Sequence, residues 1–384
     1  MSKRLAVLHS GDLDKVSPGG MDQYVKNLIT GLPGYEITLF GTTPAGKFTL
    51  GVPVIREYGG SPYVFVPLID DSAYPLTPRY MRALASNKSL FWDYDCIFAQ
   101  RIEFSLPFAM SPLRHRLVQI VHGSSASAIT HMSRARGRAY LIAERASISI
   151  ARRTIIILGR EETGMPYYLR RYHHHRDRIV YGHIPVDLSA FYPMDVNEER
   201  RRLGIPENSF VIVYSGRVED MPKRVLSYPA VSKLLDFDHR FVIVGDGSSL
   251  AELKRLGDEL SVGKNFIYAG YVSDRKQLAE YVSAADVTIN ISTDEGTCTS
   301  VLESVACGVP VVSTDTGDVR NVVHDGVNGI VIPNIEERQE LAESAASAIK
   351  RVRALLPPMD DSYRQYEKTS SLAELAQLLG EVSE

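Results

Sequence analysis

Two glutamates eight residues apart, Glu295 and Glu303, stand out in the segment 292–333, STDEGTCTSVLESVACGVPVVSTDTGDVRNVVHDGVNGIVIP. A predicted strand at 287–291 leads into the first glutamate, and a run of small residues then opens a helix. Free N–H groups at a helix start attract phosphate, so the candidate phosphate ligands are the amides of Thr297, Cys298, Thr299 and Ser300. Glu303, two turns further in, is a candidate acceptor of ribose hydroxyls. The alternative is an acidic cap on a surface helix.

Two cations follow the segment FVIVYSG (210–216), which contains another predicted strand. Arg217 comes directly after it, and Lys223 lies six residues further on, within SGRVEDMPKR. On a loop at the carboxyl end of a strand, two such cations can clamp a diphosphate and stabilise it as it leaves. The alternative is an ordinary solvated loop.

The elements that must position these residues follow an α/β pattern. The length of 384 residues favours two domains, each of roughly 150–200 residues. Short β-branched runs alternate with amphipathic helical patterns, which is typical of parallel sheets covered on both faces. The predicted strands form two series: 5–9, 37–40, 96–99, 117–121 and 154–158, then 210–214, 240–244, 266–269, 287–291 and 309–313.

The predicted boundary between the domains lies in the proline-containing segment 182–193, just before a polar helix at 196–203. We expect an acceptor-side domain over 1–185 and a donor-binding domain over 186–359. Helices at about 360–384 are expected to pack back on the first domain.

The order SGR…K (215–223), VGDGSSLAEL (244–253), NFIYAGYVSD (265–274), 284–317 and DGVNGIVIP (325–333) resembles the retaining glycosyltransferases of the GT-B fold, family 4, also called glycosyltransferase group 1. The resemblance implies two doubly wound Rossmann-like domains facing a central crevice. It also implies a nucleotide-diphosphate-sugar donor bound mainly by the second domain.

Carried onto this sequence, the resemblance makes Arg217 and Lys223 the diphosphate clamp and Glu303 the ribose ligand. Glu295 and the amides of Gly296, Thr297, Cys298 and Thr299 would contact the donor sugar and its phosphates. Tyr271 and Val272 would form the edge of the base pocket. One position departs from the family pattern: the residue after Lys223, commonly glycine, is Arg224.

The first domain resembles the family more thinly. Gly19 and Gly20 precede a helix whose apolar positions are Met21, Tyr24, Val25, Leu28 and Ile29, and they match the family's first phosphate loop. A turn that needs positive φ is the alternative. His122, at the end of a buried strand, matches the family's histidine that faces the donor sugar, although a lone histidine is more often structural. Glu103 is a candidate contact to acceptor or sugar.

Composition excludes several other classes. The apolar share of 44% and charged share of 23% are those of globular chains. Three cysteines without CxxC spacing indicate a reducing compartment and neither disulfides nor zinc. No pair of aspartates is placed to hold a catalytic metal, so we expect neither metal nor cofactor. The short apolar stretch at the N-terminus is no signal or membrane span, which favours a cytoplasmic location.

The stretch 112–178 is strongly basic within a chain of net charge −3: it carries thirteen arginines against four acidic residues, a net charge of +9. A basic face of this kind would attract an anionic membrane or a phosphorylated acceptor, placing the protein at the inner face of the membrane. The alternative is a dispersed, solvated surface. Nucleic acid is not an expected partner, because no recognition helix or aromatic sheet accompanies the arginines.

The sequence thus predicts a metal-independent, retaining hexosyl- or N-acetylhexosaminyl-type transferase. Its partners would be a nucleotide-sugar donor and an acceptor sugar, glycolipid or small molecule. Two alternatives stay open: a nucleotide-sugar epimerase of the same fold, and a non-catalytic subunit that binds the donor for a partner transferase.

Overall fold

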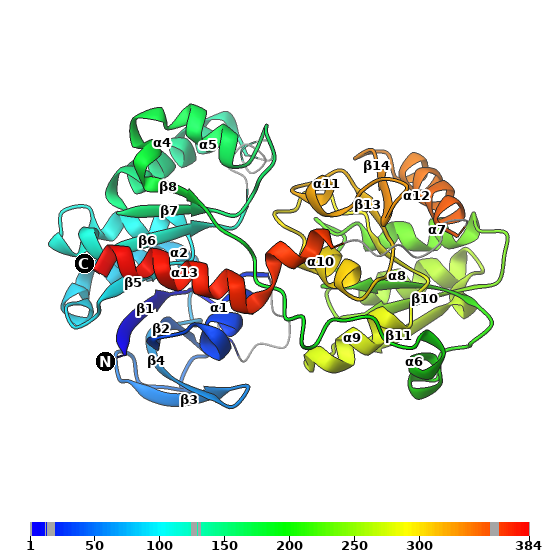
Figure 1. The fold of residues 1–384 in the computed structure, drawn as a ribbon, viewed down its shortest axis with the longest axis horizontal. Coiled ribbons are helices and arrows are strands. Elements are labelled where there is room, and N and C mark those ends of the chain that lie inside the picture. The colour runs from blue at the N-terminus through cyan, green and yellow to red at the C-terminus, as the bar shows by residue number, and fades with distance from the viewer. Residues whose placement is uncertain are drawn as a thin grey trace. The chain divides into compact units, whose positions relative to one another are not determined.

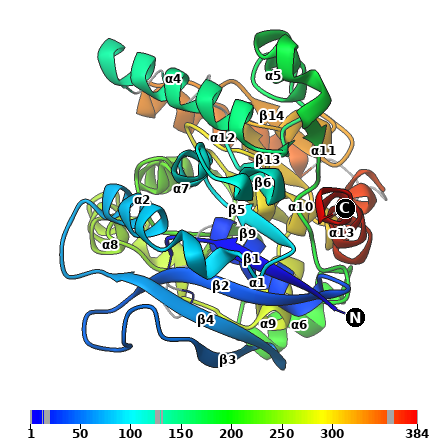
Figure 2. The same ribbon diagram turned by 90° about the vertical axis from the view of Figure 1, so that its left-hand side faces the viewer.

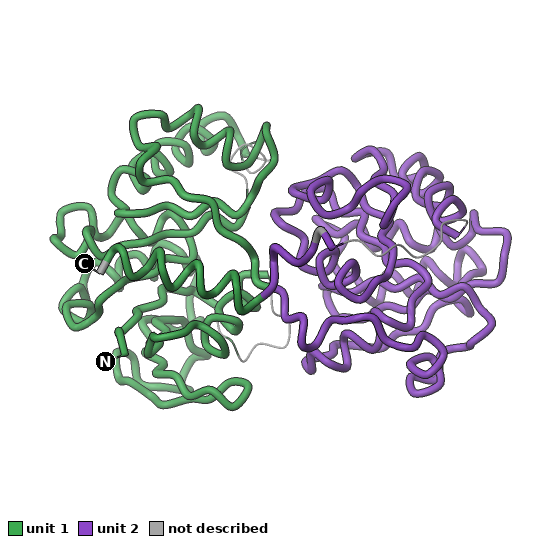
Figure 3. The backbone as a smooth tube through the Cα atoms, viewed as in Figure 1, with its two compact units in different colours: residues 1–185, 368–384 green, residues 186–367 purple. Residues whose placement is uncertain are grey.

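A computed structural model describes residues 2–11, 13, 20–123, 129, 132–353 and 361–383. The chain divides into two units, one formed by Met1–Pro185 with Lys368–Glu384 and the other by Val186–Glu367 (Figure 3). Each unit is built on a sheet of its own (Figure 1).

The first unit contains an eight-stranded sheet with the order β3-β4-β2-β1-β5-β6-β7-β8. Its strands are β1 (Lys3–Leu8), β2 (Tyr35–Thr43), β3 (Val54–Tyr58), β4 (Ser61–Asp70), β5 (Cys96–Ala99), β6 (Leu117–Val121), β7 (Arg153–Ile156) and β8 (Ile179–Tyr181). All neighbours pair in parallel except β3, which pairs antiparallel with β4 at the edge of the sheet (Figure 2).

Helices cover both faces of this sheet because side chains alternate along each strand. Leu5 and Val7 of β1 pack with α1 (Gly20–Gly31) and α13 (Lys368–Ser383). Ala6 and Leu8 face the opposite side, where α2 (Leu76–Ser86) and the 3-10 helix η2 (Ile102–Phe108) lie. Two further helices, α4 (Arg134–Ile150) and α5 (Met165–Arg171), pack against β6 to β8.

The second unit contains a six-stranded parallel sheet with the order β11-β10-β9-β12-β13-β14. Its strands are β9 (Phe210–Ser215), β10 (His239–Val244), β11 (Phe266–Gly270), β12 (Val287–Asn290), β13 (Val311–Thr314) and β14 (Gly329–Ile332). Its helices are α6 (Val196–Leu203), α7 (Tyr228–Lys233), α8 (Leu250–Glu259), α9 (Arg275–Ser283), α10 (Thr299–Ala306), α11 (Val319–Val322) and α12 (Arg338–Val352). Helices α7, α8 and α12 pack on one face of the sheet, and α9, α10 and α11 on the other.

The two predicted strand series are confirmed, but the sequence missed four strands. Two prolines in β4 disguise it as a non-strand segment, because proline removes a ladder hydrogen bond. Its antiparallel neighbour β3 alternates between exposed and half-buried residues and lacks a strong apolar signal. The other two are β8, with three residues, and β14, which begins at a glycine.

Two details of the prediction are corrected. The chain returns to the first unit at Lys368, not near residue 360, because Tyr366 is buried in the second unit and its carbonyl accepts from the Val186 amide at 2.7 Å. Met21 is 36% exposed instead of buried on the apolar face of α1, since it lies in the first turn of the helix.

Within the described ranges, no helix is both long enough and apolar enough to cross a bilayer.

Candidate active site

The strand order of the second unit places the candidate residues together. From β9 the chain adds β10 and β11 on one side, then returns to add β12, β13 and β14 on the other. The connections from the neighbouring strands β9 and β12 therefore lead to helices on opposite faces of the sheet. Open α/β sheets bind ligands at the carboxyl ends of such a pair of strands. Arg217 and Lys223 follow β9, and Glu295 follows β12.

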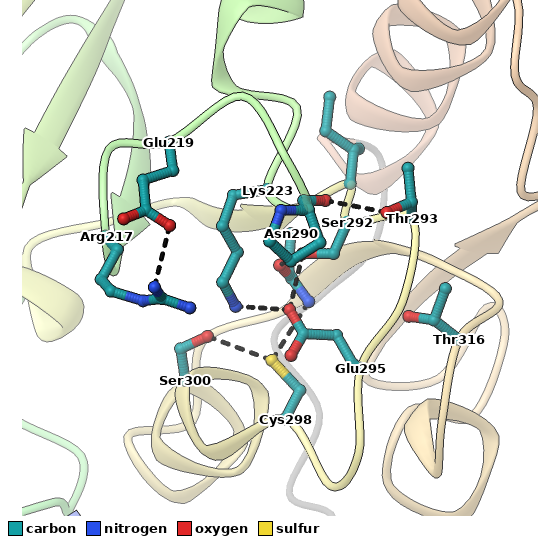
Figure 4. A network of polar contacts seen from close by, with 12 residues as sticks. Arg217, Glu219, Lys223, Asn290, Ser292, Thr293, Glu295, Cys298, Ser300 and Thr316 are labelled. Carbon is teal, nitrogen blue, oxygen red and sulfur yellow. Dashed lines mark hydrogen bonds and ion pairs between the residues drawn. The ribbon is translucent and has the colours of Figure 1, made fainter. Parts of the chain in front are cut away.

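Lys223 and Glu295 form an ion pair at this edge, with Nζ 2.5 Å from Oε1 (Figure 4). The two side chains are 17% and 14% exposed. Burial alone would lower the pKa of Lys223, but the Glu295 carboxylate outweighs it and the pKa lies above its ordinary value. Lys223 is therefore a fixed cation.

Glu295 is held from a second side, since the Ser292 hydroxyl donates to the same Oε1 atom at 2.6 Å. In the part of the chain that the structure describes, the other carboxylate oxygen takes no hydrogen bond. Glu295 can thus accept from a ligand hydroxyl without giving up Lys223. The sequence analysis missed Ser292, although it lies directly before residues 293–298, the loop that contains Glu295 and is called the acidic loop below.

Arg217 forms its ion pair with Glu219 and not with Glu295. Its Nη1 lies 2.8 Å from Glu219 Oε2, and its side chain is 40% exposed. The backbone of Arg217 is fixed, because the buried Tyr214 hydroxyl donates to the Arg217 carbonyl at 2.6 Å. The guanidinium is thus a half-buried cation, paired with Glu219, on a tethered loop.

Helix α10 begins at Thr299, within the run of small residues that was predicted to open it. Glu295 and Gly296 belong to the preceding loop, and Glu303 lies in the second turn of the helix. The residues Thr297 and Cys298 are buried, whereas Gly296, Thr299 and Ser300 are half-buried. Burial raises the pKa of the Cys298 thiol to about 11, which keeps it uncharged near neutral pH.

Glu303 is 3% exposed and forms an ion pair with Arg275 at the start of α9. The Arg275 guanidinium also lies over the Phe191 ring, 4.6 Å from its centroid. Sequence reasoning did not find this partner, because nothing local links residues 28 positions apart. The pair orients the carboxylate that the sequence assigns to ribose.

Gly317, after β13, packs against the backbone of the acidic loop. Its φ is +50°, and a Cβ at this position would lie 1.8 Å from the Gly296 carbonyl oxygen. Only glycine permits this approach. The loop containing Glu295 is therefore supported by β13 as well as by β9 and β12.

Tyr271 and Val272 follow β11 directly and are half-buried. Val272 packs against the buried cluster of α9 and α10. These positions lie two strands away from Lys223 in the sheet order.

A second polar edge lies in the first unit. His122 follows β6, and its Nε2 lies 2.8 Å from Oε1 of Gln100, which follows β5. Burial, with a smaller contribution from His9, lowers the pKa of His122 to about 3. The imidazole is therefore neutral at pH 7: it can donate one hydrogen bond and accept another, but it supplies no charge.

Two further pairs lie at the ends of the neighbouring strands. His9 after β1 is buried, and its Nε2 is 2.7 Å from Asp22 Oδ1 in α1. Glu103, after β5, pairs with Arg101. The sequence analysis missed His9, Asp22, Gln100 and Arg101. His9, Gln100 and Arg101 follow buried strands, which was an available signal, whereas Asp22 lies in the first turn of α1 and had none.

Gly19 lies outside the described residues. Gly20 is the first residue of α1, and a Cβ there would meet no atom within 4 Å. Glycine is thus not required at residue 20 by contacts within the described part of the protein.

The neutral state of His122 has a consequence for stability. Between pH 6.5 and about 3, the unfolded chain binds a proton at this residue that the folded chain does not. Stability therefore falls as pH falls through this window, by up to about 1.4 kcal/mol per pH unit. Urea unfolding of the wild type and of His122→Gln at pH 7, 6 and 5 measures this, and the wild type should lose more. Parallel curves would contradict the assignment.

The whole fold is that of the GT-B glycosyltransferases. Sucrose-phosphate synthase from Thermosynechococcus elongatus superimposes with a TM-score of 0.73 at 21% identity, covering 99% of this chain and 96% of that one. WaaG, a glycosyltransferase involved in lipopolysaccharide biosynthesis, gives 0.71 at 16% identity, covering 98% and 99%. HepE of Anabaena, solved with UDP and glucose, gives 0.70 at 16% identity, covering 99% and 100%.

Residues 195–368 match the glycosyl transferases group 1 family. The second unit is therefore a group 1 glycosyltransferase domain. The D-inositol 3-phosphate glycosyltransferase of Geodermatophilus obscurus is 32% identical over 44% of this chain and 38% of its own length. The enzyme of that name from Streptomyces bingchenggensis is 26% identical over 86% of this chain and 78% of its own length. With the first five relatives, the matched region spans about two fifths of their length.

Proposed function

We propose that this protein transfers a hexosyl or N-acetylhexosaminyl group from a nucleotide-diphosphate sugar to an acceptor, with retention at the anomeric carbon. The observation that carries the proposal is the Lys223–Glu295 pair in a group 1 glycosyltransferase domain, at the carboxyl ends of β9 and β12, where the strand order reverses. A fixed cation and a carboxylate with an open oxygen suit a ligand that presents phosphate and hydroxyls together.

In the proposed mechanism, the bond between the anomeric carbon and the diphosphate oxygen breaks, and negative charge develops on the leaving group. Lys223, Arg217 and the amides before α10 stabilise that charge. The acceptor hydroxyl attacks from the same face, and its proton passes to the departing phosphate oxygen. Glu295 accepts from the sugar hydroxyls and orients them. Fixed cations replace a metal ion in this scheme.

Neutral His122 serves the donor sugar as a hydrogen-bonding group, and Glu103 serves the acceptor. Both belong to the polar edge of the first unit, where the strand ends also bring His9 and Arg101. The set of neutral, anionic and cationic groups suits a polyhydroxylated acceptor with an anionic substituent. The names of the relatives, which specify inositol 3-phosphate, make phosphorylated polyols the first acceptors to assay.

Nucleotide release is the direct test. Purified protein is incubated with UDP-, GDP- and ADP-sugars, each with phosphorylated polyols, sugars and glycolipid acceptors, with and without EDTA. NMR of the product's anomeric proton reports the stereochemistry. We expect acceptor-dependent release, a retained configuration and no effect of EDTA.

Each alternative has its own signature in this assay. Rearrangement or hydrolysis of the donor without any acceptor would favour the epimerase. Binding of a nucleoside diphosphate without turnover of any donor would favour the non-catalytic subunit. An inverted product or a requirement for a divalent metal would refute the mechanism above.

We further propose that α4 contacts anionic membranes. Arg134, Arg138 and Arg145 are exposed along one side of this helix, beside Ile142, which is 71% exposed. Among the described residues, these three arginines form no ion pair. Other arginines of the basic stretch are engaged: Arg116 and Arg178 donate to backbone carbonyls, and Arg170 pairs with Glu161. The basic face proposed to meet the membrane is therefore limited to α4, although the net charge of +9 is spread over residues 112–178.

Vesicle sedimentation tests this contact. The protein should bind vesicles rich in anionic lipid at low salt, release at high salt and ignore neutral vesicles. Each exposed arginine close to the membrane surface contributes about 1 kcal/mol to the free energy of binding, and salt at 0.1 M screens this attraction over ~10 Å. Replacing Arg134, Arg138 and Arg145 with glutamine should weaken binding about a hundredfold. Replacing Arg116 and Arg178 in the same way should not change binding. Equal binding to both lipid types would contradict the proposal.

A further inference from the structure

Arg224, directly after Lys223, occupies a backbone conformation that normally selects glycine. Its φ is +51°, in the left-handed region, where a non-glycine residue is disfavoured. The resembled family commonly has glycine at this position. A residue that accepts this strain must gain something through its side chain.

The Arg224 guanidinium is buried and makes four hydrogen bonds to the protein. The residue is 7% exposed, and its nitrogens donate to the carbonyl oxygens of Ile291 and Ser292, each at 2.7 Å, and of Ile335 at 2.5 Å. A further N–H donates to the Asn334 side-chain oxygen. One side chain thus joins the loop after β9, the end of β12 and the segment after β14.

These contacts lead to the ion pair of the site. Ser292, held by Arg224 through its carbonyl, donates from its hydroxyl to Glu295 Oε1 at 2.6 Å, and Glu295 holds Lys223. The same two loops are tied a second time, because the Thr293 amide donates to the Pro222 carbonyl at 2.8 Å. Arg224 and Lys223 are neighbours in sequence, yet one faces the protein interior and the other faces Glu295.

We propose that Arg224 is a positioning residue that fixes the Lys223–Glu295 pair before any donor binds. Its guanidinium is hydrogen-bonded to three backbone carbonyls and to Asn334, so it does not itself contact phosphate. It prealigns the cation that meets the leaving group by locking together the loops after β9 and β12. The catalytic consequence rests on the function proposed above; the locking of the loops does not.

The test compares Arg224→Lys, which keeps the charge but loses the fork of donors, with Arg224→Gly, which also relieves the backbone. The matched control is Arg200→Lys. Arg200 is also buried and donates to the carbonyls of Ala284, Glu207 and Ser209 and to the Asp286 carboxylate, but these groups precede β9 and β12, at the opposite edge of the same sheet.

Hydrogen–deuterium exchange of the amides of residues 291–296 gives a readout that needs no turnover. In both Arg224 variants these amides should exchange about tenfold faster, while Arg200→Lys leaves them unchanged. Steady-state kinetics, measured well below the melting temperature, should show kcat about ten- to a hundredfold lower with the donor KM changed by no more than about threefold. Arg200→Lys should lower the melting temperature without changing kcat.

Unchanged exchange in both Arg224 variants would overturn the inference. So would a loss of kcat in Arg200→Lys that matches the loss in Arg224→Lys, because the effect would then be one of general stability. Faster exchange with unchanged kcat would overturn the catalytic part. If the variants exchange faster while the wild type turns over no nucleotide sugar, the loop locking is supported and the proposed function fails.

Discussion

Lys223→Ala is expected to lower kcat by roughly a hundred- to a thousandfold, with a smaller change in the donor KM. Charge develops on the leaving diphosphate mainly in the transition state, and one preorganised contact to such charge is worth about 2–4 kcal/mol. The pKa of Lys223 is raised by Glu295, so the cation persists above neutral pH and the loss should not depend on pH between 7 and 9.

The measurement is steady-state nucleotide release by Lys223→Ala beside Lys350→Ala. Lys350 lies in the same unit and forms an ion pair with Asp236 at 3.4 Å, but its side chain is 41% exposed on α12. Surface pairs of this kind contribute about 0–1 kcal/mol, so this control should keep the wild-type kcat. A Lys223→Ala enzyme with wild-type kcat would remove the loop after β9 from the mechanism.

Glu303→Gln is expected to raise the donor KM about ten- to a hundredfold and to leave kcat nearly unchanged. A ribose contact is made equally in the ground state and the transition state, so its loss weakens binding without slowing the chemical step. A hydrogen bond to a charged group contributes about 1.5–3 kcal/mol. The inhibition constant of the free nucleoside diphosphate should rise with KM.

Arg275→Gln is the matched control for Glu303. It removes the ion pair but keeps the carboxylate, so it separates loss of the ribose ligand from loss of the pair. We expect Arg275→Gln to lower the melting temperature and to change the donor KM much less than Glu303→Gln does. If the two variants raise KM equally, the role of Glu303 is to hold Arg275 and not ribose.

Local pattern accounts for most of what the sequence could predict. Buried parallel strands are short apolar runs, and both series were recognisable because burial on two faces removes polar positions. The placing of Arg217, Lys223 and Glu295 after strands followed from the same pattern. The edge strand β3 lacked that signal because it is paired on one side only and alternates between exposed and half-buried residues. Strand β4 lacked it because its two prolines are atypical of a strand that is paired on both sides.

Partner choice at the site was decided by the tertiary structure. Glu295 and Lys223 are 72 residues apart, and only the adjacency of β9 and β12 brings them within hydrogen-bonding distance. The same holds for Arg275 with Glu303. Sequence spacing specifies on which loop a side chain lies, whereas the side chain's partner depends on which loops meet.

The sequence by itself determined the α/β alternation, the group 1 motif and the residue types on which the proposed diphosphate-sugar site depends, because these are set by neighbours along the chain. The tertiary structure alone decided that Arg224, which looked like a departure from the motif, faces inward, and that His122 is neutral. Both outcomes depend on the surroundings in the fold: a guanidinium bonded to backbone carbonyls links two loops, and desolvation of the half-buried imidazole keeps it uncharged.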